Sequence, residues 1–162
     1  MLACEIKELL SSGYRLIEFS GILDDTSADV LSKLHVDASS VKKCVFDLRG
    51  VRHVNSFGIR VWSQFLRGFE EGRDIIFRHC SSNLIMQIVM MPQCLGSCKI
   101  ESFYGSYLCV DCDHEEEVFF KVKSSKQETC RDVSSLKCKK CGRLLELETE
   151  ESIFFSFLDE AG

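Results

Sequence analysis

Two Cys-x-x-Cys pairs constrain the C-terminal part of this chain more than any other sequence feature. The first pair lies in LCVDC (108–112) and the second in LKCKKCG (136–142), with 25 residues between them. One such pair could be a redox motif, whereas two pairs provide four thiolates, the tetrahedral ligand set that Zn²⁺ prefers. We therefore expect a structural zinc site with no open coordination position, made by Cys109, Cys112, Cys138 and Cys141.

The segments around these cysteines are expected to form a small module. Apolar residues at 115–123 and 143–149 predict strands that flank the site. Together with the two Cys-x-x-Cys turns, they resemble a zinc ribbon over residues 109–150. The polar segment 124–135 is expected to be a long hairpin loop, which would explain a spacer above the usual range of about 15–20 residues. His114 and Cys130 could each replace one of the four ligands.

Residues 1–108 show an alternation of strand and helix patterns. Strands are expected at 14–23, 42–48, 74–80 and 98–108. The helices expected between them lie at 24–34, 56–72 and 81–91. The run KKCVFDL (42–48) is almost continuously apolar between charged residues, which is typical of a buried parallel strand. Thr26 and Asp29 have the spacing of a capping box at the first helix. The alternation predicts an α/β fold with a mostly parallel sheet and crossover helices.

Three patches in this part resemble the STAS domain, the family of bacterial anti-sigma factor antagonists and of sulfate-transporter tails. They are GILD (21–24) leading into a helix, FDL (46–48) followed by NSFGI (55–59), and Ser82 with Ile85 and Ile88 in the third helix. The resemblance covers roughly residues 5–105 and implies a STAS-like mixed sheet. It also implies a bacterial regulatory protein that acts by protein–protein contact and is not an enzyme.

Ser56 has two alternative interpretations. In the family's antagonists, the matching serine is phosphorylated by a partner kinase that is also the anti-sigma factor. The N-terminus of a helix favours a phosphate, whose charge would break the docking of a partner. A serine before an amphipathic run is, however, also an ordinary N-cap. Asn55 and Phe57 stand where antagonists usually have Asp and a small Ser or Thr.

A docking surface for a protein partner is expected around these residues, whether or not Ser56 is phosphorylated. The partner implied by the resemblance is an anti-sigma factor, a related kinase or another regulator. An exposed Phe57 would suit a constitutive anchor. The residues expected in this surface are Asp24, Asp25, Asn55, Ser56 and Phe57.

Charge and composition exclude several other classes of protein. Acidic and basic residues balance over 1–108, whereas 109–162 carries the whole net charge of −5, which argues against general nucleic-acid binding. No apolar run is long enough to span a membrane, and the N-terminus lacks the pattern of a signal peptide. We therefore expect a cytoplasmic protein. Five scattered cysteines are expected to be core residues: Cys4, Cys44, Cys80, Cys94 and Cys98.

Two functions from other classes remain open at this point. The first is a nucleic-acid-associated adaptor that uses basic residues near the second cysteine pair, namely Lys137, Lys139, Lys140 and Arg143. The second is a thiol redox protein that uses Cys109 and Cys112. The histidines form no recognisable nucleophile motif with a serine or cysteine. The apolar tail 151–162 is expected either to pack on the sheet in place of the family's last helix or to bind a partner.

Overall fold

The computed structural model describes residues 1–9, 14–37, 42–130 and 133–159. The first sheet, sheet A, has the strand order β1-β2-β3-β4-β5. Strand β1 is antiparallel to β2, and every other neighbouring pair is parallel. This mostly parallel mixed sheet confirms the predicted fold class. Its strands are β1 (Leu2–Leu9), β2 (Tyr14–Leu23), β3 (Lys43–Val54), β4 (Asp74–Arg78) and β5 (Lys99–Ile100).

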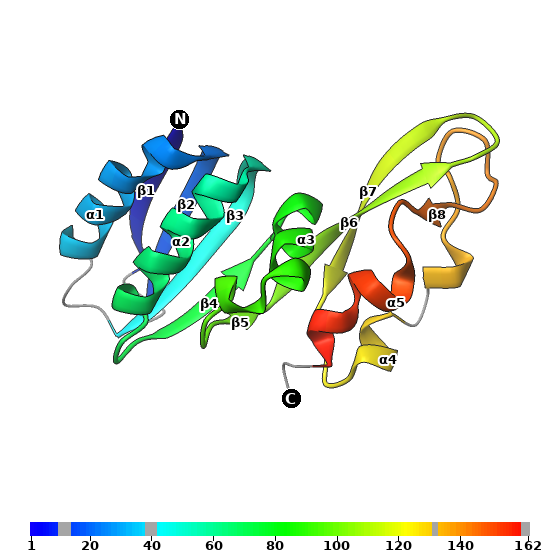
Figure 1. Ribbon diagram of the computed structural model, residues 1–162. Coiled ribbons are helices and arrows are strands. Elements are labelled where there is room, and N and C mark those ends of the chain that lie inside the picture. The colour runs from blue at the N-terminus through cyan, green and yellow to red at the C-terminus, as the bar shows by residue number, and fades with distance from the viewer. Residues whose placement is uncertain (10–13, 38–41, 131–132, 160–162) are drawn as a thin grey trace.

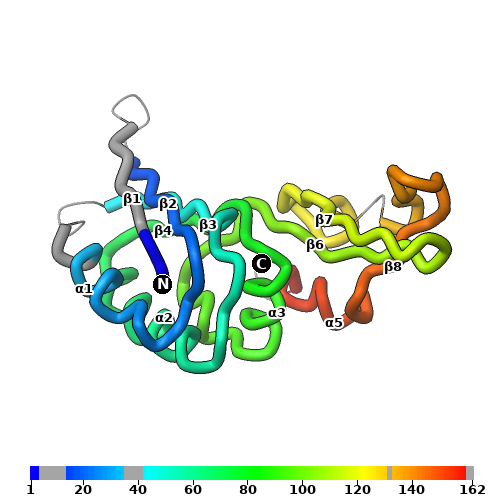
Figure 2. The backbone as a smooth tube through the Cα atoms, turned by 90° about the horizontal axis from the view of Figure 1, so that it is seen from above, coloured from blue at the N-terminus to red at the C-terminus, as the bar shows by residue number. Residues whose placement is uncertain are grey.

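Three helices cover one face of sheet A (Figures 1 and 2). They are α1 (Ala28–Asp37), which follows the short helix η1 (Asp25–Ser27), α2 (Ser56–Phe69), and α3 (Ser82–Met90), which precedes η2 (Pro92–Cys94). The strands follow one another in chain order, so the crossovers all advance in one direction. Because crossovers between parallel strands are right-handed, such an order places all the helices on the same face. No helix among the described residues covers the other face, which we call the bare face.

The core between sheet A and its helices is centred on aromatic rings. Phe46 of β3 lies 5.1 Å from Phe19 and 5.7 Å from Phe77, measured between ring centroids. Trp62 of α2 packs on these rings and donates its indole N–H to the carbonyl oxygen of Cys94 at 3.2 Å. The scattered cysteines are core residues as predicted, except that the side chain of Cys4 lies outside the described residues; those buried are Cys44, Cys80, Cys94 and Cys98.

The second sheet is antiparallel and has the order β7-β6-β8. Its strands are β6 (Ser102–Cys109), β7 (His114–Lys121) and β8 (Glu146–Leu147). The prediction of a single strand over 98–108 is wrong, because the chain leaves sheet A after β5. Residues from Ser102 onward pair with β7 along the whole length of β6. The predicted loop at 124–135 contains the short helices α4 (Lys126–Thr129) and η3 (Val133–Ser135). A domain division at residue 108 remains a prediction.

The aromatic side chains of the tail are buried against the second sheet and α3 rather than exposed. The tail forms α5 (Glu151–Phe154) and η4 (Ser156–Leu158), which lie beside β6 and α3 (Figure 1). Three of its rings surround Phe103 of β6 at centroid distances of 6.1, 6.1 and 5.1 Å, namely Phe154, Phe155 and Phe157. The tail therefore joins the second sheet to α3. No helix among the described residues has the length and apolar character needed to cross a membrane.

Candidate metal centre and docking surface

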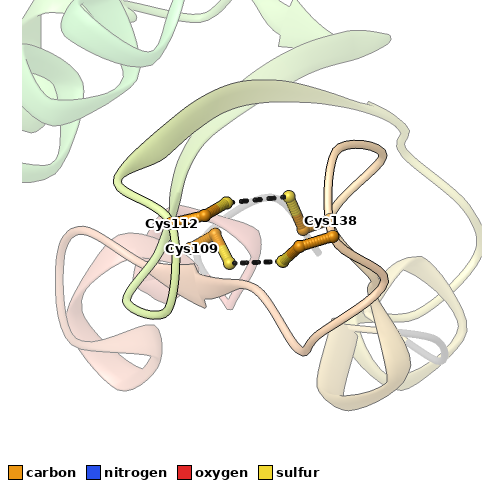
Figure 3. A group of neighbouring side chains, drawn as sticks. Cys109, Cys112 and Cys138 are labelled. Carbon is orange, nitrogen blue, oxygen red and sulfur yellow. Dashed lines mark hydrogen bonds between the residues drawn. The ribbon is translucent and has the colours of Figure 1, made fainter.

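The four predicted cysteine ligands lie together at the far end of the second sheet (Figure 3). The Sγ atoms of Cys109 and Cys141 are 3.4 Å apart, and those of Cys112 and Cys138 are 3.7 Å apart. All four sulfur atoms lie within 4.8 Å of one another. A tetrahedral site with Zn–S bonds of about 2.3 Å needs sulfur atoms about 3.8 Å apart. The cluster therefore has the size and chemistry to hold a metal ion.

Both Cys-x-x-Cys turns are built in the same way. The residue after the second cysteine has a positive φ, 51° at Asp113 and 76° at Gly142. The N–H group of this residue donates to the carbonyl oxygen of the first cysteine, Cys109 or Cys138, at 2.8 Å in both turns. A positive φ is uncommon for a residue other than glycine. Its presence at Asp113 shows that the first turn keeps this geometry without a glycine.

Backbone N–H groups also prepare Cys138 to act as a thiolate ligand. The N–H of Lys140 donates to the Sγ of Cys138 at 3.3 Å. Burial raises the pKa of the Cys138 thiol. Hydrogen bonds from the backbone N–H groups of Cys141 and Lys140, together with those from the side chains of Cys112 and Cys141, outweigh burial and lower this pKa to about 7. A thiolate is the form that binds a metal. Cys130 lies outside the group of four, and His114 lies instead near Glu116 and Cys138.

Glu116 links β7 to the second turn and is a site residue that sequence reasoning missed. Its side chain is only 7% exposed. Its carboxylate accepts the backbone N–H of Lys139 at 2.8 Å and lies 2.7 Å from the Nζ atom of the same residue. The sequence signal was alternation, because Glu116 shares the inner face of β7 with Val118 and Phe120, whereas Glu117 is exposed.

Replacing Glu116 with alanine is expected to weaken zinc binding by about 10–100-fold, the usual effect of losing a residue that orients metal ligands. Lys139→Ala should have a much smaller effect, because the Lys139 side chain is 81% exposed and the backbone N–H remains. Competition with a chelator measures both affinities. Glu117→Ala is the matched control, and an equal loss of affinity in the two glutamate variants would contradict this role for Glu116.

The structure places Ser56 at the first residue of α2, with its side chain exposed. The N-cap is Asn55, whose Oδ1 accepts the N–H of Gly58 at 2.8 Å. The interpretation of Ser56 as the N-cap is therefore wrong. Asn55 takes this role because it has an extended backbone, with φ of −104°, immediately before the first helical residue. The hydroxyl of Ser56 has no hydrogen-bond partner among the described residues.

A second capped turn carries the acidic residues of the expected docking surface. Asp24 accepts the backbone N–H of Thr26 at 3.0 Å and its hydroxyl at 2.6 Å. The N–H of Asp24 in turn donates to the Oγ of Ser27 at 3.1 Å. The capping box thus joins Asp24 and Ser27, and the predicted box of Thr26 and Asp29 is wrong. Donation by the Thr26 hydroxyl contributes most to lowering the pKa of Asp24 below its ordinary value.

The two turns are packed directly against each other. A Cβ atom on Gly58 would overlap the carbonyl oxygen of Leu23 and would lie 2.7 Å from the backbone nitrogen of Asp24. The N–H of Asn55 also donates to the carbonyl oxygen of Leu23 at 3.2 Å. The expected residues therefore lie at one end of sheet A. We call them the docking patch, together with Ile22, which is also exposed: Ile22, Asp24, Asp25, Asn55, Ser56 and Phe57.

Replacing Asn55 with alanine is expected to lower the free energy of unfolding by about 1 kcal/mol, the usual value of an N-cap. Ser56→Ala should change it by less than about 0.5 kcal/mol, because this exposed side chain makes no capping hydrogen bond. Urea unfolding at neutral pH measures both values. A larger loss in Ser56→Ala than in Asn55→Ala would show that Ser56 caps the helix after all.

Comparison with known proteins finds similarity to solved structures alone. No protein-family model matches the chain, and no curated protein matches it. Among solved structures, it is similar to the anti-sigma factor antagonist SpoIIAA in its unphosphorylated form, with 13% sequence identity and a TM-score of 0.46. The match covers 60% of this chain and 87% of the other. At this identity, the similarity concerns the fold alone.

Proposed function

We propose that this chain is a non-enzymatic, STAS-like bacterial regulatory protein of the cytoplasm that binds a protein partner through its docking patch. The observation that carries this proposal is the exposure of Phe57, which is 61% exposed in the first turn of α2. This turn packs closely against the backbone of Leu23 and Asp24. Large aromatic side chains are frequent anchors of protein interfaces. Two capped turns and the close contact at Gly58 hold the patch in one conformation before binding.

Ser56 is the proposed switch within this patch. Its hydroxyl is exposed and lies beside Phe57 in the first turn of α2, where helix N–H groups can donate hydrogen bonds to a phosphate. Phosphorylation would add a charge of about −1.5 to −2 next to the anchor. A partner that buries Phe57 would then have to bury this charge as well. The kinase and the docked partner would be an anti-sigma factor or a related regulator.

The four-cysteine cluster is proposed to be a structural Zn²⁺ site in a zinc-ribbon-like module. Cys109, Cys112, Cys138 and Cys141 would supply all four ligands, and bound zinc would supply folding energy rather than chemistry. The short sulfur–sulfur distances join the two Cys-x-x-Cys turns to each other. This arrangement supports a shared metal ion over a redox pair within one turn.

Affinity purification of the tagged chain from its native cell tests the regulatory function. Mass spectrometry of the bound proteins and of the peptide that contains Ser56 is the readout. We expect one regulator to be recovered with the unphosphorylated form and to be absent from the form phosphorylated at Ser56. Recovery of the same partner with both forms would contradict the switch, and recovery of no partner would contradict the docking function.

A further inference from the structure

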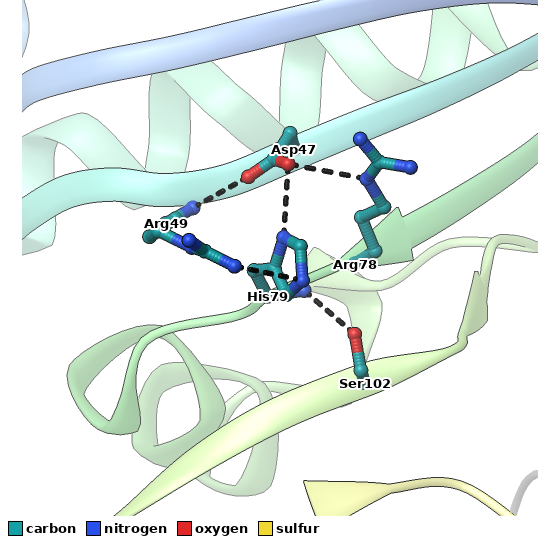
Figure 4. Close-up of polar contacts among 5 residues, drawn as sticks. All are labelled: Asp47, Arg49, Arg78, His79 and Ser102. Carbon is teal, nitrogen blue, oxygen red and sulfur yellow. Dashed lines mark hydrogen bonds and ion pairs between the residues drawn. The ribbon is translucent and has the colours of Figure 1, made fainter. Parts of the chain in front are cut away.

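The bare face of sheet A contains a charged hollow that neither the docking patch nor the metal centre uses. Its volume is about 590 Å³, which lies within the usual range of small-ligand pockets of about 300–1,000 Å³. The hollow lies across β2, β3 and β4, where Glu18, Asp47 and Arg78 occupy one row of paired residues. Its charged and polar walls include Glu18. Figure 4 shows four further residues of these walls, Asp47, Arg49, Arg78 and His79.

Two departures from regular backbone geometry give this hollow its shape. Glu18 pairs with Asp47 and Ser20 pairs with Gly50, so β3 has one extra residue between these pairs. A bulge of this kind re-aims side chains and is frequent beside functional sites. The bulge needs Gly50, because a Cβ atom there would lie 2.6 Å from the carbonyl oxygen of Phe19. At the opposite wall, His79 has a φ of 54°, which is uncommon for a residue other than glycine.

Asp47 organises the polar groups of the hollow. Its Oδ2 accepts from the Nδ1 of His79 at 2.9 Å and from the Nε of Arg78 at 3.1 Å, and its Oδ1 accepts the backbone N–H of Arg49 at 3.2 Å. The Nε2 of His79 lies 3.0 Å from an Nη atom of Arg49. A guanidinium group can only donate, so the imidazole nitrogen is the acceptor in this contact.

The second sheet holds His79 in this position. Its backbone N–H donates to the Oγ of Ser102 at 3.0 Å (Figure 4), and its ring lies 5.8 Å from that of Phe119. The side chains of Asp47, Arg78 and His79 are only 14%, 25% and 20% exposed. The network is therefore fixed from several sides and is partly shielded from water.

In this network, arginine N–H donors outnumber the acceptors that they contact. The carboxylate of Asp47 already accepts three hydrogen bonds. Each guanidinium group, in contrast, has one nitrogen bonded within the network, Nε in Arg78 and Nη2 in Arg49. Its remaining N–H groups have no hydrogen-bond partner among the described residues. Glu18, on the facing wall, has an interaction partner of its own. A negatively charged hydrogen-bond acceptor would satisfy these remaining donors.

We propose that the hollow binds a small organic anion whose phosphate or carboxylate group is held by Arg49 and Arg78. Guanidinium groups suit both oxyanions because they donate parallel hydrogen bonds to two oxygen atoms. The volume leaves room for a ligand that is larger than the oxyanion itself. The site lies on the face opposite to α1, α2 and α3, so its ligand would be bound independently of the docking patch.

Titration of the full chain with inorganic phosphate, and separately with citrate, tests the proposal at constant ionic strength. The NMR signals of the His79 ring report binding. We expect saturable shifts with at least one of the two anions, and the tighter anion identifies the oxyanion class. Arg49→Gln should weaken binding by about tenfold, the usual effect of removing a charged hydrogen-bond donor. Arg78→Gln should weaken it by at least as much.

Arg60→Gln is the matched control, because Arg60 is exposed on α2, away from the hollow. Arg78→Gln also loses the ion pair with Asp47, and this loss could prevent folding. Thermal unfolding without anion will reveal whether it does. If Arg78→Gln does not fold, the affinity of Arg49→Gln decides the result. Shifts that do not saturate with either anion would overturn the proposal. It would also be overturned if Arg49→Gln and Arg60→Gln bound the anion as tightly as the unchanged chain.

Discussion

Replacing Cys138 with serine is expected to unfold the second sheet while β1 to β5 keep their structure. Structural zinc contributes apparent binding energies of about 10–16 kcal/mol in small zinc modules, so losing one of four thiolates removes most of the stability of such a module. The aromatic core around Phe46 and Trp62 belongs to sheet A and α2, and its rings do not depend on the cysteine cluster. The tail should be released as well, because Phe155 packs on Phe120 of β7.

Hydrogen exchange, with zinc measured by elemental analysis, separates the two parts of the chain. The unchanged protein should contain one zinc ion per chain, and Cys138→Ser should lose both the zinc and the protection of β6 and β7. Cys130→Ser is the control in the same module, because Cys130 lies outside the four-cysteine group. Loss of protection in β2 and β3 as well would show that the two sheets fold as one unit.

Replacing Gly58 with alanine is expected to lower the free energy of unfolding by about 2–4 kcal/mol. At an unconstrained helix position, the same change would stabilise the helix by about 1 kcal/mol. The sign reverses here because the added methyl group would overlap the backbone of Leu23 and Asp24, which cannot move without disturbing the end of β2. The start of α2 would be pushed away from the turn that carries Asp24.

Urea unfolding gives the size of this effect, and NMR shifts of Asp24 and Thr26 report the displacement of the turn. Ser56→Ala provides the comparison, because it places a methyl group in the same helical turn with its side chain exposed. If Gly58→Ala were as stable as the unchanged protein, the two turns would not be packed as described, and the rigidity proposed for the docking patch would be lost.

The order of strands and helices in sheet A could be predicted because each pattern is local. Strands β2 and β4 and all three helices lie within a few residues of their predicted positions, whereas β3 continues to Val54 instead of ending at residue 48. Strand β1 was missed, although Leu2, Cys4 and Ile6 alternate with Ala3, Glu5 and Lys7 and the strand pairs with the next one along the chain, β2. The break at Glu101 was missed because only the pairing partners distinguish β5 from β6.

The candidate sites show the same division between local and long-range information. The four cysteines were found because their spacing is a chemical pattern. The N-cap was assigned to Ser56 rather than Asn55 because both residue types can cap and they are adjacent. The hollow around Asp47 and His79 could not be predicted, because its residues come from separate strands and are brought together by a bulge and by the turn at His79.

The central claim is that the docking patch binds a protein partner through Phe57. Its most direct test is the affinity of the isolated partner for Phe57→Ser, compared with its affinity for Met90→Ser. The two replaced residues are similarly exposed, Phe57 at 61% and Met90 at 63%. We expect Phe57→Ser to weaken binding by at least about 2 kcal/mol, or roughly 30-fold, as for an interface anchor. Met90→Ser should leave the affinity unchanged. Equal affinities of the two variants would contradict the account.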